Sequence, residues 1–340
     1  MNQGTNQGTK DKNEFKQVID DLTTGKLETG LPPLKMTRFP KYVYHFTDLL
    51  NAKNILTEGY IYCRNEALEK GIMKVDNASK TVIEHTWQDR KNYVRFYFRP
   101  KTPTQYRNEG IRSLSQINPD LKAHCPVPVF FLFDSLSMLT MENSSFTYGN
   151  LAADSTTIYN DAESFRKMPF EFVYHEGYYD PINESYIKYH RHAELIIPNK
   201  CDLKFLKKIV CRSQAERETF INLLDEPTKQ NFRDIIIVDP KNWFFYSAWT
   251  FVESVNLTKE KVTFSFNVNK QEPTFNAKLI MKDLTASGIY ETWNNQKYQC
   301  PNVDQTITYS KPYNHYTISF YLDEHLVYKG TYNSMDSVPF

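Results

Sequence analysis

The sequence predicts an α+β domain followed by an all-β module, and three observations support this fold class. Residues 38–243 contain apolar and alternating runs of strand length that are interspersed with helical patterns. Residues 244–340 contain runs that alternate with period two between turn residues, which is typical of an immunoglobulin-like sandwich. At 340 residues, the chain is also longer than one average domain. We therefore expect an N-terminal tail with an accessory helix over residues 1–37, an α+β domain over 38–243 and a β-sandwich interaction domain over 244–340.

The composition indicates a cytoplasmic protein with no overall excess of cations. The formal net charge is +1, so contact with nucleic acid must come from local clusters of positive side chains. The five cysteines are scattered without a CxxC motif, which indicates reduced thiols and argues against a zinc site or a disulfide framework. The apolar runs are all shorter than a membrane span. We therefore predict no metal site and no contact with a membrane.

The first 40 residues contain a tail and a short helix. Residues 1–12 are polar and repetitive, which predicts a disordered tail. Apolar side chains recur at helical spacing over residues 15–22, and Gly25 ends that pattern. This helix is expected to be an accessory to the domain that follows.

A strand that leads directly into a helix comes next. Residues 41–46 alternate as a strand, and Thr47 or Asp48 can cap the helix that ends at Gly59. This junction places His45, Thr47 and the free helix amides at one edge, where an amide or a phosphate could be received. Taken alone, His45 is better explained as a structural histidine with satisfied hydrogen bonds.

The stretch over residues 93–98 predicts a strand with two different faces. Apolar side chains alternate there with two arginines and a tyrosine, and Pro100 and Pro103 end the pattern. Arginine, lysine and tyrosine at the mouth of a strand suit a phosphorylated aromatic ligand. The alternative is a half-buried strand with a solvated face, which this stretch alone slightly favours.

The rest of the α+β domain contains two further strands and a loop rich in tyrosine. Residues 65–92 read as mostly helical, and residues 127–134 are apolar enough for the centre of a sheet. Residues 175–190 read as a polar loop with several tyrosines. The strand over residues 191–198 carries Glu194 among aliphatic neighbours, where an acid is expected to have a function.

Four blocks of the chain, taken in order, resemble the DarT-type ADP-ribosyltransferases, toxins that move ADP-ribose from NAD to bases of single-stranded DNA. The blocks are Tyr44-His45-Phe46-Thr47 with Asn54, Ile55-Leu56 and Gly59; Tyr93 to Pro100; Phe146 to Ala152; and Arg191 to Ile196. Each block is weak alone, but their ordered occurrence over roughly residues 38–225 is fairly specific. The resemblance implies the ADP-ribosyltransferase-like fold, a split mixed or antiparallel sheet with helices.

The resemblance also implies which residues catalyse the transfer. Glu194 would be the catalytic acid. An arginine in or near the second block would grip the phosphates of NAD and order the scissile ribose. Arg95 and Arg99 are the candidates, and Arg90 also lies close enough in sequence to be considered.

The same resemblance implies that NAD is the cofactor, consumed as a substrate. His45 and Thr47 would hold its nicotinamide riboside, and Asn54 would contact it from the following helix. Tyr97 and Tyr106 complete the expected cofactor contacts. The family usually has proline where this chain has Arg95, and aspartate is common at Tyr148, so the choice of substrate is less secure than the reaction type.

The tyrosines and cations before Glu194 fit a groove for unpaired bases. Stacking surfaces combined with positive charge are typical of single-strand binding. The candidate residues are Tyr178, Tyr179, Tyr186 and Arg191. Packing of this loop against the β-module is the alternative for the same residues.

Our leading hypothesis is an NAD-dependent ADP-ribosyltransferase toxin that modifies a base of single-stranded nucleic acid, in a toxin-antitoxin or phage-defence system. DNA follows from the resemblance, and RNA, including messenger RNA, is a serious alternative. A second hypothesis is an inactive transferase-like binding module that engages an antitoxin, a chaperone or a phage protein. A third is an enzyme that modifies protein or hydrolyses NAD.

Overall fold

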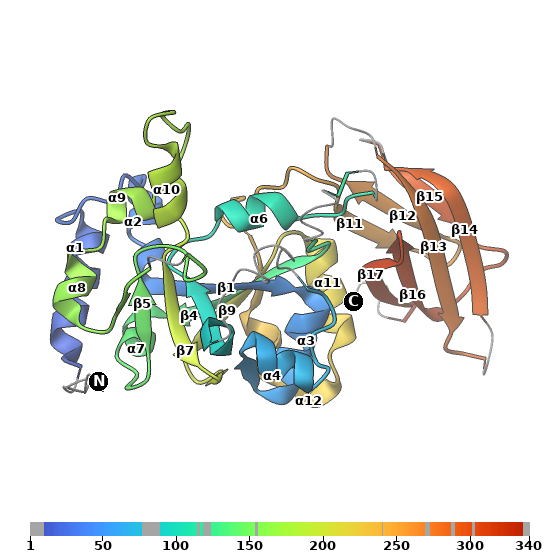
Figure 1. Ribbon diagram of the computed structural model, residues 1–340. Helices are drawn as coiled ribbons and strands as arrows, with labels where there is room; N and C mark the ends of the chain where they lie inside the picture. Colours follow the sequence, from blue (N-terminus) through green and yellow to red (C-terminus); the bar gives the residue numbers. More distant parts are fainter. Residues whose placement is uncertain are drawn as a thin grey trace.

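The computed structural model describes residues 10–76, 89–113, 116–117, 124–153, 156–239, 241–268, 273–286, 290–300 and 303–335. Figure 1 shows an α+β part beside a pair of β-sheets that the C-terminal residues form. Helix α11 (Gln214–Leu223) lies between them and contacts strand β17 (His325–Asn333) of the C-terminal part. The predicted order of an α+β part followed by an all-β part is therefore confirmed.

An eight-stranded sheet forms the centre of the α+β part. Its strand order is β10-β9-β4-β1-β3-β7-β5-β6, and the parallel pairing of β9 with β10 makes it a mixed sheet. The strands are β1 (Tyr42–Asp48), β3 (Tyr93–Tyr97), β4 (Pro128–Asp134), β5 (Ser145–Thr147), β6 (Ile158–Tyr159), β7 (Glu194–Pro198), β9 (Leu206–Cys211) and β10 (Ile236–Val238). A separate antiparallel pair consists of β2 (Tyr60–Tyr62) and β8 (Lys200–Asp202).

The large sheet consists of two halves that meet at one point. β1 and β4 pair along all of β1, and β3 and β7 pair along all of β3. In contrast, β1 and β3 share a single register pair, Tyr44 with Tyr97. Because a ladder of backbone hydrogen bonds holds paired strands together, its interruption here leaves room beside β1 for a side chain. This interruption matches the split that the resemblance implies.

Strand β4 is central, as its apolar sequence predicts. It lies between β1 and β9, and all its residues are buried except Asp134 at its end. The Asp134 carboxylate accepts a hydrogen bond from the Ser137 N–H at 2.9 Å and so caps α7 (Ser135–Leu139). A carboxylate at this position satisfies an otherwise free helix amide.

Short helices surround the sheet. In the α+β part they are α1 (Lys12–Thr24), α2 (Pro33–Met36), α3 (Leu49–Glu58), α4 (Arg64–Glu69), α6 (Pro103–Asn108), α7, α8 (Ala162–Arg166), α9 (Phe170–Val173), α10 (Glu184–His190), α11 and α12 (Glu226–Phe232), with 3-10 turns η1 (Phe39–Lys41), η2 (Asp89–Asn92) and η3 (Arg233–Ile235). The accessory helix α1 packs into the main core, where the Phe15 and Phe165 rings lie 5.8 Å apart.

The predicted limits of α3 are confirmed, whereas the loop predicted over residues 175–190 and the helix predicted over residues 65–92 differ from the structure. Asp48 caps α3 by accepting from the Leu50 N–H at 2.9 Å, and Gly59 ends that helix at φ +74°. The loop predicted over residues 175–190 is wrong in its second half, because α10 forms there with Ile187 on its buried face. Of the helix predicted over residues 65–92, residues 77–88 lie outside the described residues, and the rest contains α4 and η2.

The C-terminal part is built from two antiparallel sheets around one apolar core. One sheet has the order β11-β12-β15 and the other the order β14-β13-β16-β17. Its strands are β11 (Val252–Leu257), β12 (Lys261–Phe266), β13 (Thr274–Asp283), β14 (Tyr290–Gln299), β15 (Gln305–Thr308), β16 (His315–Leu322) and β17. Buried side chains alternate along β16, which gives the period-two pattern seen in the sequence.

The two parts are joined by hydrogen bonds along α11. The Ser213 hydroxyl donates to the Val252 carbonyl at 2.5 Å, and the Lys329 N–H donates to the Thr219 hydroxyl at 3.0 Å. Phe244 and Phe245 pack with core residues of the large sheet, so we propose that the domain boundary lies just before β11 rather than at residue 244. The described helices are all too short or too polar to span a lipid bilayer.

Candidate active site

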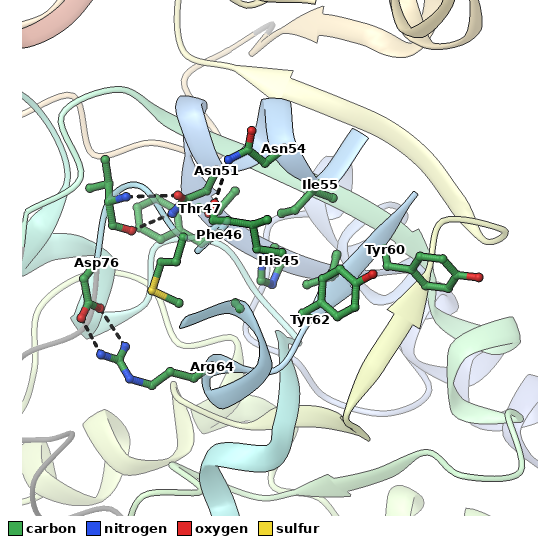
Figure 2. Close-up of a pocket in the computed structure, with 15 residues that line it drawn as sticks. His45, Phe46, Thr47, Asn51, Asn54, Ile55, Tyr60, Tyr62, Arg64 and Asp76 are labelled. Carbon is green, nitrogen blue, oxygen red and sulfur yellow. Dashed lines mark hydrogen bonds and ion pairs between the residues drawn. The ribbon is translucent and has the colours of Figure 1, made fainter. Parts of the chain in front are cut away.

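A cavity of about 190 Å³ opens beside the end of β1 (Figure 2). We call it the first cavity. It is lined by His45, Phe46, Thr47, Asn51, Asn54, Ile55, Tyr60, Ile61, Tyr62, Arg64, Ala67, Ile72, Met73, Val75 and Asp76. The structure therefore brings together three of the predicted cofactor residues, His45, Thr47 and Asn54.

His45 occupies the interruption between β1 and β3. Its Nδ1 lies 3.1 Å from the Arg95 carbonyl oxygen. Because a carbonyl only accepts, Nδ1 carries the proton and Nε2 is left as an acceptor. Burial lowers the pKa of His45 to about 4, so the ring is neutral at physiological pH. A neutral imidazole with a free acceptor nitrogen can receive a hydroxyl or an amide N–H from a ligand.

Two asparagines on one face of α3 fix the opposite wall of the first cavity. Asn54 Nδ2 donates to the Ile72 carbonyl at 2.7 Å, and Asn51 Nδ2 donates to the Val75 carbonyl at 2.7 Å. Asn54 therefore uses one of its two amide N–H donors on the protein, which leaves its second N–H and its side-chain oxygen for a ligand. Beyond these residues, Arg64 Nη1 pairs with Asp76 Oδ1 at 2.8 Å (Figure 2).

Glu194 is buried at the start of β7, with 1% of its side chain exposed. Its Oε2 accepts from the Leu151 N–H at 2.9 Å, and its Oε1 lies 3.8 Å from Arg95 Nη1. Burial raises the pKa of Glu194, while the positive charge of Arg95 and the Leu151 N–H oppose that shift. Strand β7 pairs with β3 on one side and with β5 on the other, and Glu194 lies directly opposite Tyr97 on β3 and Thr147 on β5.

Arg95 connects Glu194 with the first cavity. Its guanidinium lies beside the carboxylate, and its backbone carbonyl holds the His45 ring. Glu194 itself is not part of the cavity lining, because β3 stands between β7 and β1. Arg95 on β3 therefore contacts both of the other predicted residues: Glu194 through its side chain and His45 through its backbone.

The loop after β5 holds the Glu194 carboxylate in place. Arg90 Nη1 donates to the Leu151 carbonyl at 2.7 Å, so it anchors the residue whose N–H binds Glu194. Gly149 lies directly under the Tyr189 ring, where a Cβ atom would come within 2.3 Å of the ring. Arg90, which the sequence left as a third candidate, therefore supports the acid through this loop.

Arg99 does not lie with Glu194. It is buried, and its guanidinium donates to the carbonyls of Pro100 and Val173 at 2.8 and 3.1 Å and to that of His175. Burial and the nearby Arg191 lower its pKa to about 9. Because β3 ends at Tyr97, the alternation that placed Arg99 beside Arg95 no longer applies. Of the two candidate arginines, Arg95 is therefore the one that lies beside the acid, and Arg99 does not.

A second cavity of about 570 Å³ lies between α6 and α10. It is lined by Pro103, Tyr106, Arg107, Gly177, Tyr178, Tyr179, Pro181, Glu184, Lys188, Arg191 and Tyr246. Three of the predicted nucleic-acid residues are here, namely Tyr178, Tyr179 and Arg191. Tyr106, predicted as a cofactor contact, also lines this cavity rather than the first. Tyr186 lies outside it, with its ring 4.3 Å from that of His190.

The second cavity is tied to the strand that carries Glu194. His192 Nδ1 lies 2.8 Å from the Lys188 carbonyl, and its Nε2 lies 3.0 Å from the Thr104 hydroxyl on α6. The Tyr97 and His192 rings are 6.5 Å apart. His192 therefore couples both walls of the cavity to the segment that precedes Glu194.

Sequence patterns missed the site residues that are distant in the chain. Tyr246 donates to the Lys101 carbonyl at 2.6 Å across 145 positions, and no local pattern indicates such a contact. Asn51 was also missed, although its spacing of three from Asn54 on one helix could have pointed to a shared face.

Comparison with known proteins gives one family and one fold. The family model of DarT, described as a ssDNA thymidine ADP-ribosyltransferase, matches residues 44–245. No curated protein matches the chain. Among solved structures, a DarT of Thermus sp. 2.9 in complex with ADP-ribosylated ssDNA is 17% identical over 61% of this chain and 97% of that one, with a TM-score of 0.50. At this identity the likeness shows the fold.

Two further solved structures match with lower scores. The same Thermus sp. 2.9 DarT in complex with carba-NAD+ is 18% identical over 61% of this chain and 98% of its own, with a TM-score of 0.47. The Thermosipho africanus DarTG in complex with ADP-ribose is 18% identical over 64% of this chain and 53% of its own, with a TM-score of 0.46.

Proposed function

From the premise that this chain belongs to the DarT family of ssDNA thymidine ADP-ribosyltransferases, we propose that it transfers ADP-ribose from NAD to a base of single-stranded DNA. The observation that carries the proposal is the contact of Arg95 with both Glu194 and His45. One acid, one arginine and one neutral histidine are thereby held in one arrangement. These are the residue types that the transfer needs.

We assign the nicotinamide end of NAD to the first cavity. At about 190 Å³ this cavity is smaller than the roughly 300–1,000 Å³ typical of whole-ligand pockets, so it suits one end of a dinucleotide. The acceptor Nε2 of His45 and the Thr47 hydroxyl would bind polar groups of that end. Arg95 would bind a phosphate or a ribose hydroxyl, because its guanidinium is the cation beside the acid.

Glu194 acts in this proposal on the ribose and on the incoming base. The bond from ribose C1′ to the nicotinamide nitrogen breaks, and a bond from C1′ to a base nitrogen forms. Positive charge develops on the ribose as the first bond lengthens, and the buried carboxylate stabilises it. The base nitrogen loses a proton as it attacks, and Glu194 accepts that proton.

Substitution of Glu194 tests the reaction. With labelled NAD and pools of single-stranded oligonucleotides, the wild-type chain is expected to label DNA, and Glu194→Gln is expected to lose about 10²-fold or more of the rate. Glu163→Gln, an exposed acid on α8, is the matched control and should keep full activity. Undiminished labelling by Glu194→Gln would contradict the catalytic assignment.

The polymer that is modified and the biological setting are further parts of the proposal. DNA follows from the family, and RNA is the alternative that the same labelling experiment decides when DNA and RNA pools are supplied separately. A growth-arresting role with an antitoxin or chaperone partner, or in phage defence, predicts that expression is toxic and that Glu194→Gln removes the toxicity. We propose a cytoplasmic location, because NAD and nucleic acid are both present there.

We propose that the C-terminal part is an immunoglobulin-like sandwich that serves as an interaction domain. Its strand order supports this, since the first, second and fifth strands form one sheet and the remaining four form the other. Compared with the constant-type arrangement, the fourth strand has moved to pair with the third. The catalytic groups named above all lie in the other part of the chain.

A further inference from the structure

The second cavity combines exposed aromatic rings with cations. Tyr178 is 86% exposed and Tyr106 is 61% exposed, although both line a concave site. An exposed aromatic ring in a concave site is a platform on which a base can stack. The cavity volume of about 570 Å³ lies within the range of whole-ligand pockets.

Positive charge at the base of this cavity exceeds the negative charge. Arg191 is buried and contacts the Tyr179 and Tyr246 hydroxyls, and no carboxylate lies within ion-pair distance of it in the described part of the chain. Arg99 lies close enough behind Arg191 for their charges to repel, which contributes to its lowered pKa. Glu176 offsets part of the positive charge of Arg99, and Arg191, which has no ion-pair partner among the described residues, adds a further positive charge that attracts an anion.

The rim of the cavity adds two further cations. Arg107 is exposed on α6, and Lys188 projects from α10 with Glu184 as its ion-pair partner. A phosphate that enters between α6 and α10 would therefore meet both Arg107 and Arg191, which line the cavity. Contacts with phosphate of this kind fix the position of a strand without reading its bases.

The cavity lies within a few nucleotides of the reacting carboxylate. Arg191 lines the cavity and precedes Glu194 by three residues, so their Cα atoms are at most about 11 Å apart. Successive nucleotides of one strand are separated by about 3.4 Å or more along its axis. A strand whose target base reaches Glu194 thus places a flanking nucleotide, one to about three positions away, at the second cavity.

We propose that the second cavity binds a nucleotide that flanks the modified one, with its base on Tyr178 or Tyr106 and its phosphate on Arg107 and Arg191. This inference rests on the proposed function and adds to it the part of the protein that selects sequence context. A tyrosine platform that accepts only some flanking bases would restrict which target bases reach Glu194.

Binding measurements on an inactive background test the cavity separately from the reaction. Glu194→Gln is titrated with fluorescent single-stranded DNA oligonucleotides that differ only in the bases flanking one target position. Adding Tyr178→Ala is expected to weaken binding about tenfold and to reduce the differences between flanking bases. Adding Arg107→Ala should weaken all oligonucleotides equally and lower the salt dependence by about one phosphate contact.

Tyr290→Ala is the control, since Tyr290 is also an exposed tyrosine, at 61%, but lies on β14 of the other part. It should bind every oligonucleotide as the parent does. The inference is overturned if Tyr178→Ala and Arg107→Ala keep the affinity and the flanking preference of the parent. An absence of NAD-dependent labelling by the wild-type chain would instead contradict the proposed function, while the binding titrations would still report on the cavity.

Discussion

Burial and the neighbouring positive charge shift the pKa of Glu194 in opposite directions. Burial raises the pKa of the carboxyl, and the Arg95 guanidinium and the Leu151 N–H lower it. Because the folded pKa lies above the unfolded one, stability is highest below the unfolded pKa and falls as the pH rises through the folded pKa. The ionised acid therefore destabilises the fold at neutral pH. Such a cost is typical of groups that are kept for chemistry.

The charge of Arg95 should set the acid limb of the pH-rate profile. The carboxylate is the active form, so the rate falls as the pH drops through the pKa of Glu194. Arg95→Gln removes the charge that lowers this pKa, and we expect the acid limb to move to higher pH and the rate at pH 7 to fall by about 10²-fold. The measurement is the rate at saturating NAD over a pH series.

Arg95→Lys keeps a positive charge and serves as the control for this prediction. Its acid limb should remain near that of the wild-type chain, even if binding of NAD weakens through loss of the planar guanidinium. An acid limb of Arg95→Gln that stays in place, or moves to lower pH, would show that the charge of Arg95 does not act on Glu194.

The loop between β5 and β6 is the element that presents an N–H to Glu194. Leu151 supplies that N–H, Arg90 anchors the loop at the Leu151 and Ala153 carbonyls, and the Tyr189 ring presses on Gly149. In the sequence this stretch was one of the four blocks of the resemblance, without a role for Leu151 or Gly149. The close approach of a ring explains why glycine is needed at that turn.

Gly149→Ala should displace the loop. The new Cβ would come within 2.3 Å of the Tyr189 ring, so either the ring or the loop must move. We expect a loss of about 1–3 kcal/mol in the free energy of unfolding and at least a tenfold loss of transferase rate. Chemical denaturation and the labelling assay measure these effects.

A second substitution distinguishes this clash from other causes. In the Gly149→Ala background, Tyr189→Leu opens the space and should restore part of both losses. Recovery is incomplete because the Tyr189 hydroxyl also bonds Thr156 at 3.1 Å. If the double variant is no better than Gly149→Ala, or if Tyr189→Leu alone is equally damaging, the close approach is not the reason for the glycine.

Local sequence patterns predicted where the helices and strands of the site begin and end better than they predicted which side chains meet in the folded chain. Asp48 and Gly59 bound α3 as expected, because capping depends on residues next to the helix. The position of Arg99 could not be predicted, since the chain leaves the sheet after Tyr97 and alternation then says nothing about direction. The second cavity was only partly predicted, because its Tyr246 wall is brought in by tertiary packing.

At the scale of the whole molecule, a buried ionic cluster joins the two parts. Arg212, just before α11, pairs with Glu216 in the first turn of that helix and lies 3.7 Å from Glu109. Its guanidinium also lies 4.2 Å from the centre of the Phe251 ring, next to β11. Glu109 in turn accepts from the Tyr246 N–H at 3.0 Å. The cluster thus connects the sandwich, α11 and one wall of the second cavity.

Arg212→Met should destabilise the molecule and loosen the sandwich from the α+β part. It leaves the Glu109 and Glu216 carboxylates buried without the guanidinium that pairs with both, which costs about 3–5 kcal/mol of unfolding free energy in comparable buried pairs. Urea denaturation followed by tryptophan fluorescence measures this loss, and Arg233→Met, an exposed arginine, is the control. Combining Arg212→Met with Glu109→Gln and Glu216→Gln removes the uncompensated charges and should recover much of the stability. If the triple variant is as unstable as Arg212→Met, packing of the arginine rather than its charge holds the two parts together.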